Sequence, residues 1–218
     1  MNGCYGSDVP LGIIPLGTAN VLSKEIGLKN NRDQIVQTIL SGQADKVFIP
    51  KINQQYFSLM ASVGLDAYSV KFVSSGLKKM VGEAAYIFSF LRQLFKPQKA
   101  IYNVNIDDIK YIASTVIVTN GKYYGGKYIC AAYASIKEQK LYVILNKAEG
   151  RKSALGFFIA LIRNKISECE NVEIIPAKNV IITATECAPV QVDGDYFGDL
   201  PVTISSSENS INLVMPNS

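Results

Sequence analysis

The stretch LGIIPLGTANVLSKEIGL at residues 11–28 decides how the first part of the chain folds. Its apolar start, 11–14, predicts a short strand, and the Pro- and Gly-containing segment 15–20 predicts a turn. Residues 21–26 predict a helix that ends at a glycine, and a second helix is predicted at 33–42. The order strand, turn, helix, helix is typical of a fragment of an α/β unit, which here lacks sheet neighbours for its strand.

The turn PLGTAN is a candidate phosphate-binding site. A turn between a strand and a helix brings several backbone N–H groups and the positive end of the helix dipole to one place. Gly17 lets a ligand approach the backbone, and Thr18 offers a hydroxyl beside it. Thr18 or Asn20 can also simply cap the helix, so an ordinary strand–helix turn explains the same spacing and both interpretations stay open.

From residue 46 the sequence consists mainly of short β-rich runs separated by Gly, Asn, Asp or Lys. Such spacing is typical of a β-sandwich or barrel. Two helical stretches, at about 75–96 and about 151–165, interrupt the strands. The predicted fold class is therefore α+β, with a C-terminal antiparallel β-sandwich that carries two inserted helices at 45–218, preceded by the α/β fragment at 1–44.

Composition excludes several classes of function. The 218 residues are 48% hydrophobic and 18% charged, so the chain can bury a core, and no apolar run approaches the roughly 18 residues of a spanning helix. Histidine is absent, which removes His-based triads and His metal ligands. The four cysteines form no CxxC pair and are expected to be free thiols in a reducing cytoplasm. The 22 basic residues are scattered, so nucleic acid is not an expected partner, although the net charge of +4 suits a nucleotide or an anionic membrane surface.

A second candidate site is the acid turn in VQVDGDYFGD at 190–199. Asp193 and Asp195 flank a glycine that permits a tight hairpin. Either carboxylate could accept a proton from a hydroxyl substrate or help to hold a metal ion, although a plain hairpin turn has the same sequence. Asparagine also tolerates tight turns, so replacing either aspartate is expected to change folding little.

Four stretches together resemble the diacylglycerol-kinase-like lipid kinases, the family that includes sphingosine and ceramide kinases, and its bacterial members above all. They are the segments at 11–28, 57–67 (FSLMASVGLDA), 118–134 (VTNGKYYGGKYICAAYA) and 190–201 (VQVDGDYFGDLP), in the family's order and approximate spacing. The resemblance implies an α/β ATP-binding domain, of which 1–44 is a remnant, followed by a β-sandwich lipid-kinase domain at 45–218. It implies transfer of the γ-phosphate of ATP to the hydroxyl of a membrane lipid, diacylglycerol or similar, with Mg²⁺.

The resemblance also implies roles for single residues. Thr18 matches the family's ATP-contacting threonine, and Gly17 and Asn20 belong to the same nucleotide-binding turn. Asp195 falls on the second acid of the family's DGE motif, the proton acceptor for the lipid hydroxyl, and Asp193 falls on the first. Asp195 is one methylene shorter than the family's glutamate, so the reach of the acid is reduced.

Two further departures concern the metal and the phosphate loop. By position, Ser135, Glu138 and Lys140 would contact a structural Mg²⁺, but the family's Asp and turn Gly have become Glu138 and Gln139. The family's GGDGT loop normally precedes the residues that match Asn2, and the sequence begins at Met1. The 218-residue chain alone is therefore predicted not to phosphorylate lipids. A catalytically inactive lipid- or protein-binding remnant and a nucleotide kinase of the NAD-kinase type stay open as alternatives.

The same resemblance suggests a cytoplasmic protein that is peripheral to the membrane. The predicted helices at 75–96 and 151–165 are apolar and each is followed by basic residues, which would suit contact with a bilayer interface. Packing of both helices on the sandwich is the alternative. The exposed edges of a sandwich could also pair between two chains, so a homodimer stays open.

Overall fold

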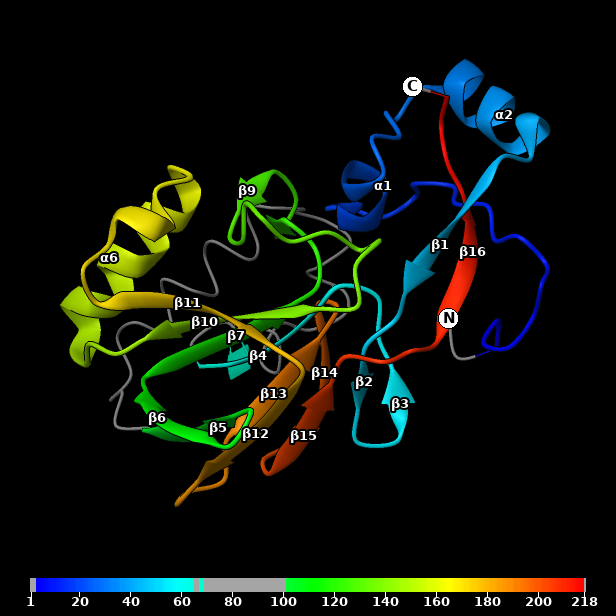
Figure 1. Ribbon diagram of the computed structural model, residues 1–218. Coiled ribbons are helices and arrows are strands. Elements are labelled where there is room, and N and C mark those ends of the chain that lie inside the picture. Colours follow the sequence, from blue (N-terminus) through cyan, green and yellow to red (C-terminus); the bar gives the residue numbers. More distant parts are fainter. Residues whose placement is uncertain (1–2, 65–66, 69–100, 218) are drawn as a thin grey trace.

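The computed structural model describes residues 3–64, 67–68 and 101–217 (Figure 1). In this part of the chain the helices are α1 Val21–Glu25, α2 Arg32–Ser41, α6 Gly150–Ile162 and a 3₁₀ turn at Ile166–Glu168. The strands of the first half are β1 Ala44–Phe48, β2 Lys51–Ile52, β3 Gln55–Tyr56, β4 Met60–Val63, β5 Tyr102–Ile106, β6 Ile109–Ala113, β7 Thr115–Thr119, β8 Tyr123–Tyr124 and β9 Tyr128–Ile129. Those of the second half are β10 Leu141–Asn146, β11 Val172–Ala177, β12 Asn179–Ala184, β13 Pro189–Val192, β14 Asp195–Asp199, β15 Val202–Ser205 and β16 Ser210–Val214.

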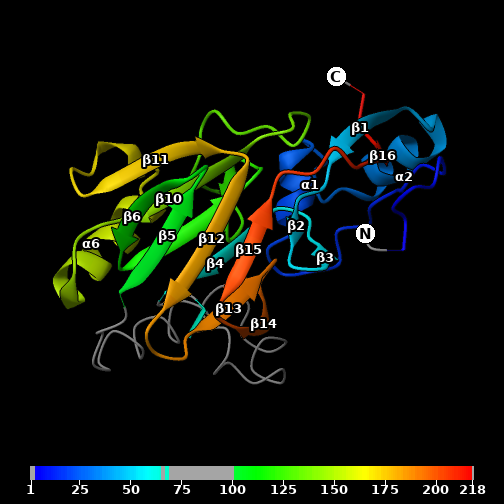
Figure 2. The same ribbon diagram turned by 60° about the horizontal axis from the view of Figure 1, so that its bottom comes forward.

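Two six-stranded antiparallel sheets form a β-sandwich, as Figures 1 and 2 show. One sheet has the strand order β11-β10-β7-β4-β13-β14 and the other has the order β3-β2-β15-β12-β5-β6. Their facing sides enclose the largest apolar cluster of the described residues, which includes Val116, Leu145, Val180 and Ile204. The predicted antiparallel sandwich in an α+β fold is confirmed.

The alternation of side chains explains how each sheet is covered. In β5 the residues Tyr102, Val104 and Ile106 are buried while Asn103 is exposed, so that sheet has one face toward the core and one toward water. In β7 all five residues are buried, which requires cover on both faces of the other sheet. Odd and even positions of β7 and β10 accordingly belong to two different apolar clusters.

Helix α6 covers much of the outer face of the sheet that contains β7 and β10. Its Leu161 is buried in a cluster with Ile117 of β7 and Ile144 of β10, and Phe157 packs against the same cluster. The helix predicted at about 151–165 is therefore present and packs on the sandwich. The helix predicted at about 75–96 lies outside the described residues.

The N-terminal helices, β1 and the last strand β16 lie together on the side of the molecule opposite α6, beyond the sandwich (Figure 1). β1 pairs with β16 along its whole length, so the last strand leaves the sandwich and joins the first. The strand predicted at 11–14 is wrong beyond its first residue, because only Leu11 forms a bridge, parallel to Leu213. Leu11 and Ile13 instead pack into an apolar cluster with β1 and β16, and Ile14 is 58% exposed.

Helix α2 is unusual because its one buried residue is polar. Thr38 is buried, whereas Val36, Ile39 and Leu40 are exposed. Its ends agree with the sequence: Asn31 caps the first turn by accepting from the N–H groups of the next residues, and Gly42 closes the helix with a φ of 62°. Three apolar side chains of α2 are therefore exposed, whereas other apolar residues of the N-terminal fragment pack on β1 and β16.

Replacing Leu145 with alanine tests the sandwich core. Leu145 has no exposed surface and lies between the two sheets, so the change removes apolar contacts and leaves a cavity. We expect the free energy of unfolding to fall by about 2–5 kcal/mol in urea denaturation. The matched control is Ile112→Ala on β6, which is 60% exposed and should change stability by less than about 0.5 kcal/mol. Equal losses in the two variants would contradict this placement of the core.

Candidate functional site

The PLGTAN turn is held by the side chain of Asn20. The Asn20 Oδ1 atom accepts a hydrogen bond from the N–H of Gly17 at 2.8 Å, and its Nδ2 donates to the carbonyl of Gly17 at 2.6 Å. Asn20 has a φ of 46°, a left-handed conformation that asparagine tolerates better than most residues. The turn is therefore a closed unit in which both backbone polar groups of Gly17 are occupied by one side chain.

This arrangement corrects the predicted cap of α1. Asn20 stands at the N-cap position, but its side chain makes no hydrogen bond to the first turn of the helix. It stabilises the preceding turn instead. Gly17 and Thr18 are exposed, but the N–H and the carbonyl of Gly17 are already bonded to Asn20. The exposed side chain of the turn that a phosphate-binding role would use is that of Thr18, and Asn20 fixes the backbone before it.

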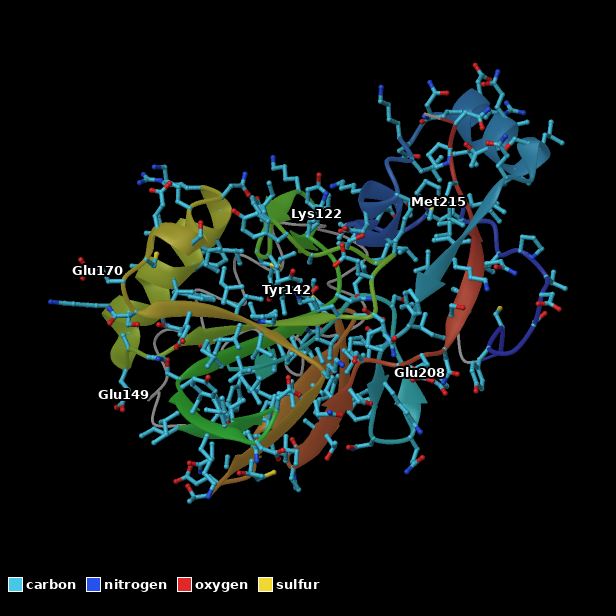
Figure 3. All side chains as sticks on the ribbon, in the orientation of Figure 1. Lys122, Tyr142, Glu149, Glu170, Glu208 and Met215 are labelled. Atoms are coloured by element: carbon cyan, nitrogen blue, oxygen red, sulfur yellow. The ribbon has the colours of Figure 1, made fainter. Side chains whose placement is uncertain are left out.

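A carboxylate links α1 to the sandwich. Oε2 of Glu25 accepts hydrogen bonds from the backbone N–H groups of Lys122 at 2.9 Å and Tyr123 at 3.2 Å. Lys122 and Tyr123 begin the small β8–β9 hairpin, and Figure 3 shows the labelled Lys122 on this loop beside α1. Nothing in the spacing of the sequence pairs residue 25 with residue 122, so this contact was not predicted.

Burial of Glu25 has electrostatic consequences. Burial raises the pKa of the Glu25 carboxyl, and the two backbone N–H groups that donate to it only partly offset this effect. Burial, together with the nearby Glu25 charge, also raises the pKa of the Cys130 thiol to about 12. Cys130 is therefore protonated at neutral pH and does not serve as a nucleophile. It is free, as are Cys4, Cys169 and Cys187, in agreement with the predicted absence of disulfides.

Leu59 connects this contact to the acid turn. The Leu59 carbonyl accepts from the N–H of Asn120 at 3.1 Å and from the Oγ of Thr119 at 3.1 Å. Gly121 follows directly, and a Cβ atom there would lie 2.8 Å from Cδ2 of Leu59 and 2.9 Å from Oε2 of Glu25. A larger residue at position 121 would therefore displace the ends of these two side chains.

The acid turn is a two-residue hairpin between β13 and β14. Asp193 has a φ of 50° and Gly194 a φ of 90°, the left-handed pair that an Asp-Gly hairpin turn needs. Three consecutive backbone N–H groups donate to the carboxylate of Asp193. They belong to Ser58, Leu59 and Met60, with N···O distances of 2.6, 2.9 and 3.1 Å. The carboxylate of Asp193 is thus occupied in fixing the segment that leads into β4.

Asp195 lies in a different environment, although it is only two residues away. It begins β14 opposite Val192 and is exposed. Both side chains are exposed, so the described geometry separates them by one feature: the Asp193 carboxylate accepts from three backbone N–H groups of residues 58–60, whereas Asp195 stands at the start of β14.

The stretch proposed for Mg²⁺ is a self-contained turn. The carbonyl of Ser135 accepts from the N–H of Glu138 at 2.9 Å, and the carbonyl of Glu138 accepts from the N–H of Lys140 at 2.9 Å. The neighbouring ammonium group of Lys137 pairs with Asp45. No group of three His, Cys, Asp or Glu side chains suited to a metal ion occurs among the described residues. One carboxylate, engaged carbonyls and an adjacent cation do not fit a hard divalent ion, so the geometry argues against Mg²⁺ at this turn.

Two protein families and several known proteins match this chain. The YegS C-terminal NAD kinase beta sandwich-like domain matches residues 60–215, and the diacylglycerol kinase catalytic domain matches residues 1–52. A protein of Staphylococcus aureus strain MSSA476 named "Putative lipid kinase" is 28% identical over the whole of this chain, which covers 73% of that protein. A relative in strain JH9 with the same description is 27% identical with the same coverage.

Solved structures show the same fold. The crystal structure of a "putative diacylglycerol kinase" from Bacillus anthracis aligns with a TM-score of 0.74 over 94% of this chain and 68% of that one, at 24% identity. A diacylglycerol kinase structure from the same organism aligns with a TM-score of 0.66 at 19% identity, over 94% of this chain and 66% of that one. Both likenesses concern the arrangement of the backbone.

Exchanging Asp193 for asparagine should destabilise the protein. An amide keeps one acceptor oxygen and loses the negative charge, while three N–H groups remain aimed at it. We expect the free energy of unfolding to fall by about 1–3 kcal/mol. The matched variant Asp195→Asn should stay within about 0.5 kcal/mol of the parent in the same urea titration. The earlier expectation that either exchange leaves folding unchanged would then hold for Asp195 alone.

Replacing Glu25 with glutamine tests the effect of burial on its pKa. Between the pKa of an unfolded glutamate, about 4.3, and the raised pKa in the folded protein, the folded state holds more proton than the unfolded state. The contribution of Glu25 to stability is therefore fully present below this window and is lost as the pH rises through it. Glutamine can accept the same two N–H groups without a charge, so its advantage over glutamate should be larger at pH 7 than at pH 4.

Urea denaturation at both pH values measures this difference. Glu170→Gln, at an exposed position, is the control for loss of a negative charge alone. An advantage of Glu25→Gln that is the same at pH 4 and pH 7 would show that the pKa of Glu25 is not raised.

Proposed function

The chain belongs to the diacylglycerol kinase-like family of lipid kinases, and we propose that it supplies the acceptor side of such a kinase, with Asp195 as the base. In this reaction the γ-phosphoryl group of ATP passes to a lipid hydroxyl. The hydroxyl proton goes to the Asp195 carboxylate while the oxygen attacks phosphorus and ADP leaves. The acceptor is a membrane lipid such as diacylglycerol.

The observation that carries the proposal is the unequal environment of the two acids. Both side chains are exposed, but the Asp193 carboxylate accepts from three backbone N–H groups of residues 58–60, whereas Asp195 stands at the first position of β14. A general base must come within hydrogen-bond distance of the proton that it accepts, and the three N–H groups on Asp193 give that residue a structural role instead. Asp193 supports this role by fixing the hairpin on which Asp195 stands.

The nucleotide side rests on the PLGTAN turn. Thr18 is exposed and would contact the phosphates of ATP, Gly17 leaves room for their approach because it has no side chain, and Asn20 holds both backbone polar groups of Gly17. Glu25 then couples this turn to the β8–β9 hairpin, and Leu59 continues the contacts to Asp193. Nucleotide turn and acid turn are thus parts of one hydrogen-bonded framework. ATP-dependent kinases use Mg²⁺ to neutralise the phosphates, which is a different ion from the structural Mg²⁺ considered at the 135–140 turn, and no step is assigned to either.

A chimera tests this function. The part of the Staphylococcus aureus relative that this chain does not cover is joined to residues 1–218, and transfer of radiolabelled phosphate from ATP to diacylglycerol in mixed micelles is measured. We expect transfer by the chimera and a loss of about 10²-fold or more in the chimera with Asp195→Asn. Asp195→Glu, which restores the longer acid of the related kinases, should keep activity.

The control for loss of one negative charge is Asp108→Asn in the β5–β6 turn, which should leave the rate of transfer unchanged because that turn is exposed and belongs to another hairpin. Full transfer by the Asp195→Asn chimera would refute Asp195 as the base. A folded chimera that binds lipid vesicles without transferring phosphate would favour the inactive lipid-binding alternative.

A further inference from the structure

Helix α6 has an outward face that the sandwich does not cover. Its buried side packs Leu161 and Phe157 on the sheet. The residues of the opposite side follow one another at helical spacing and are all exposed. They are Lys152, Leu155, Gly156, Ile159 and Arg163, here called the α6 stripe.

The α6 stripe has apolar residues in its middle and a cation at each end. Leu155 and Ile159, one turn apart, are 39% and 41% exposed, and Gly156 between them has open space where a side chain would be. Lys152 lies near the start of the helix, and Arg163 follows its last residue. A helix that is apolar on nearly every side is normally covered on every side, and in the described structure α6 is covered on one.

The charges on α6 itself are all positive, and the acidic residues Glu149 and Glu168 lie just outside the helix. Residues 150–167 contain four basic residues and no acidic one. Lys165 pairs with Glu168, but neither Lys152 nor Arg163 has an acidic partner within ion-pair distance in the part of the chain that the structure describes. Exposed aliphatic side chains between unpaired cations match the boundary between acyl chains and anionic headgroups.

We propose that the α6 stripe is a docking surface for an anionic lipid bilayer. Leu155 and Ile159 enter the boundary of the acyl chains, and Lys152 and Arg163 meet anionic headgroups at the two ends of the helix. No helix of the described chain is long and apolar enough to cross a membrane, so the contact is with one surface of the bilayer. Gly156 lets the helix axis lie close to that surface because it adds no side chain to the stripe.

The position of α6 connects this surface to the rest of the site. Oδ1 of Asn164, directly after the helix, accepts a hydrogen bond from the N–H of Ile129 at 2.6 Å. Ile129 belongs to the same β8–β9 hairpin whose other end donates to Glu25. Helix α6 and helix α1 therefore hold the two ends of one hairpin (Figure 3), so the docking surface is fixed relative to the nucleotide turn.

Sedimentation with vesicles tests the proposal without any need for phosphoryl transfer, so the result is independent of the proposed kinase activity. The 218-residue chain is mixed with phosphatidylcholine vesicles and with phosphatidylcholine vesicles that contain phosphatidylglycerol. We expect binding to the anionic vesicles only, weakened by salt. The double variant Leu155→Gln and Ile159→Gln should bind about tenfold more weakly, and Lys152→Gln or Arg163→Gln about fivefold more weakly each.

The matched control carries the same exchange at two isoleucines on the other sheet. Ile109 and Ile112 of β6 are 59% and 60% exposed, and Ile109→Gln with Ile112→Gln should bind as the parent does. Circular dichroism establishes that each variant is folded, and the single cation variants keep the test valid if the double variant does not fold.

Three results would overturn the proposal. They are the absence of binding to anionic vesicles by the parent chain, full binding by folded α6 variants, and an equal loss in the β6 control. Sedimentation velocity tests the alternative that the α6 stripe binds a second copy of this chain. If Leu155→Gln with Ile159→Gln converts a dimer to a monomer and leaves vesicle binding intact, the stripe is an interface between copies.

Discussion

The carboxylate of Asp193 is the constraint on which the candidate site depends. One side chain at a hairpin turn accepts from three consecutive N–H groups of residues 58–60, across 135 to 133 positions of sequence. Charge-assisted hydrogen bonds of this kind are stronger than neutral ones, and three of them leave the segment little freedom. The entry to β4, the hairpin that carries Asp195 and the carbonyl of Leu59 therefore have fixed positions relative to one another.

From Leu59 the same framework extends to both helices at the edge of the sandwich. Thr119 and Asn120 bond to the Leu59 carbonyl, and Gly121 brings the chain against Glu25 of α1. The β8–β9 hairpin that follows is held by Glu25 at one end and by Asn164 at the other. The side chains of Glu25 and Asn164, which no sequence pattern singled out, thus link the N-terminal fragment and α6 to the same hairpin. Partial burial raises the pKa of the Glu25 carboxyl, so the charged form is less favoured here than in water, although two backbone N–H groups donate to it.

Local patterns predicted the elements that local interactions determine. The helix at 150–162 and the antiparallel sandwich followed from periodicity, because alternating burial in β5 and helical spacing in α6 are properties of neighbouring residues. The strand expected at 11–14 failed for the opposite reason. A strand needs a partner along its length, and β16 offers one only to Leu11. Asn20 was expected to cap a helix, but its left-handed backbone turns the amide toward Gly17 instead.

The sequence by itself determined the class of fold, the Asp-Gly hairpin and the two candidate turns, since backbone conformation and side-chain alternation depend on residues a few positions apart. The tertiary structure decided which of two neighbouring, equally exposed acids is held in place: the Asp193 carboxylate accepts from the N–H groups of a distant segment. It also decided that the half-buried Glu25 contacts the β8–β9 hairpin and that the carbonyls of Ser135 and Glu138 accept hydrogen bonds within their own turn. Burial and long-range hydrogen bonds depend on what the fold brings together, which spacing along the chain does not encode.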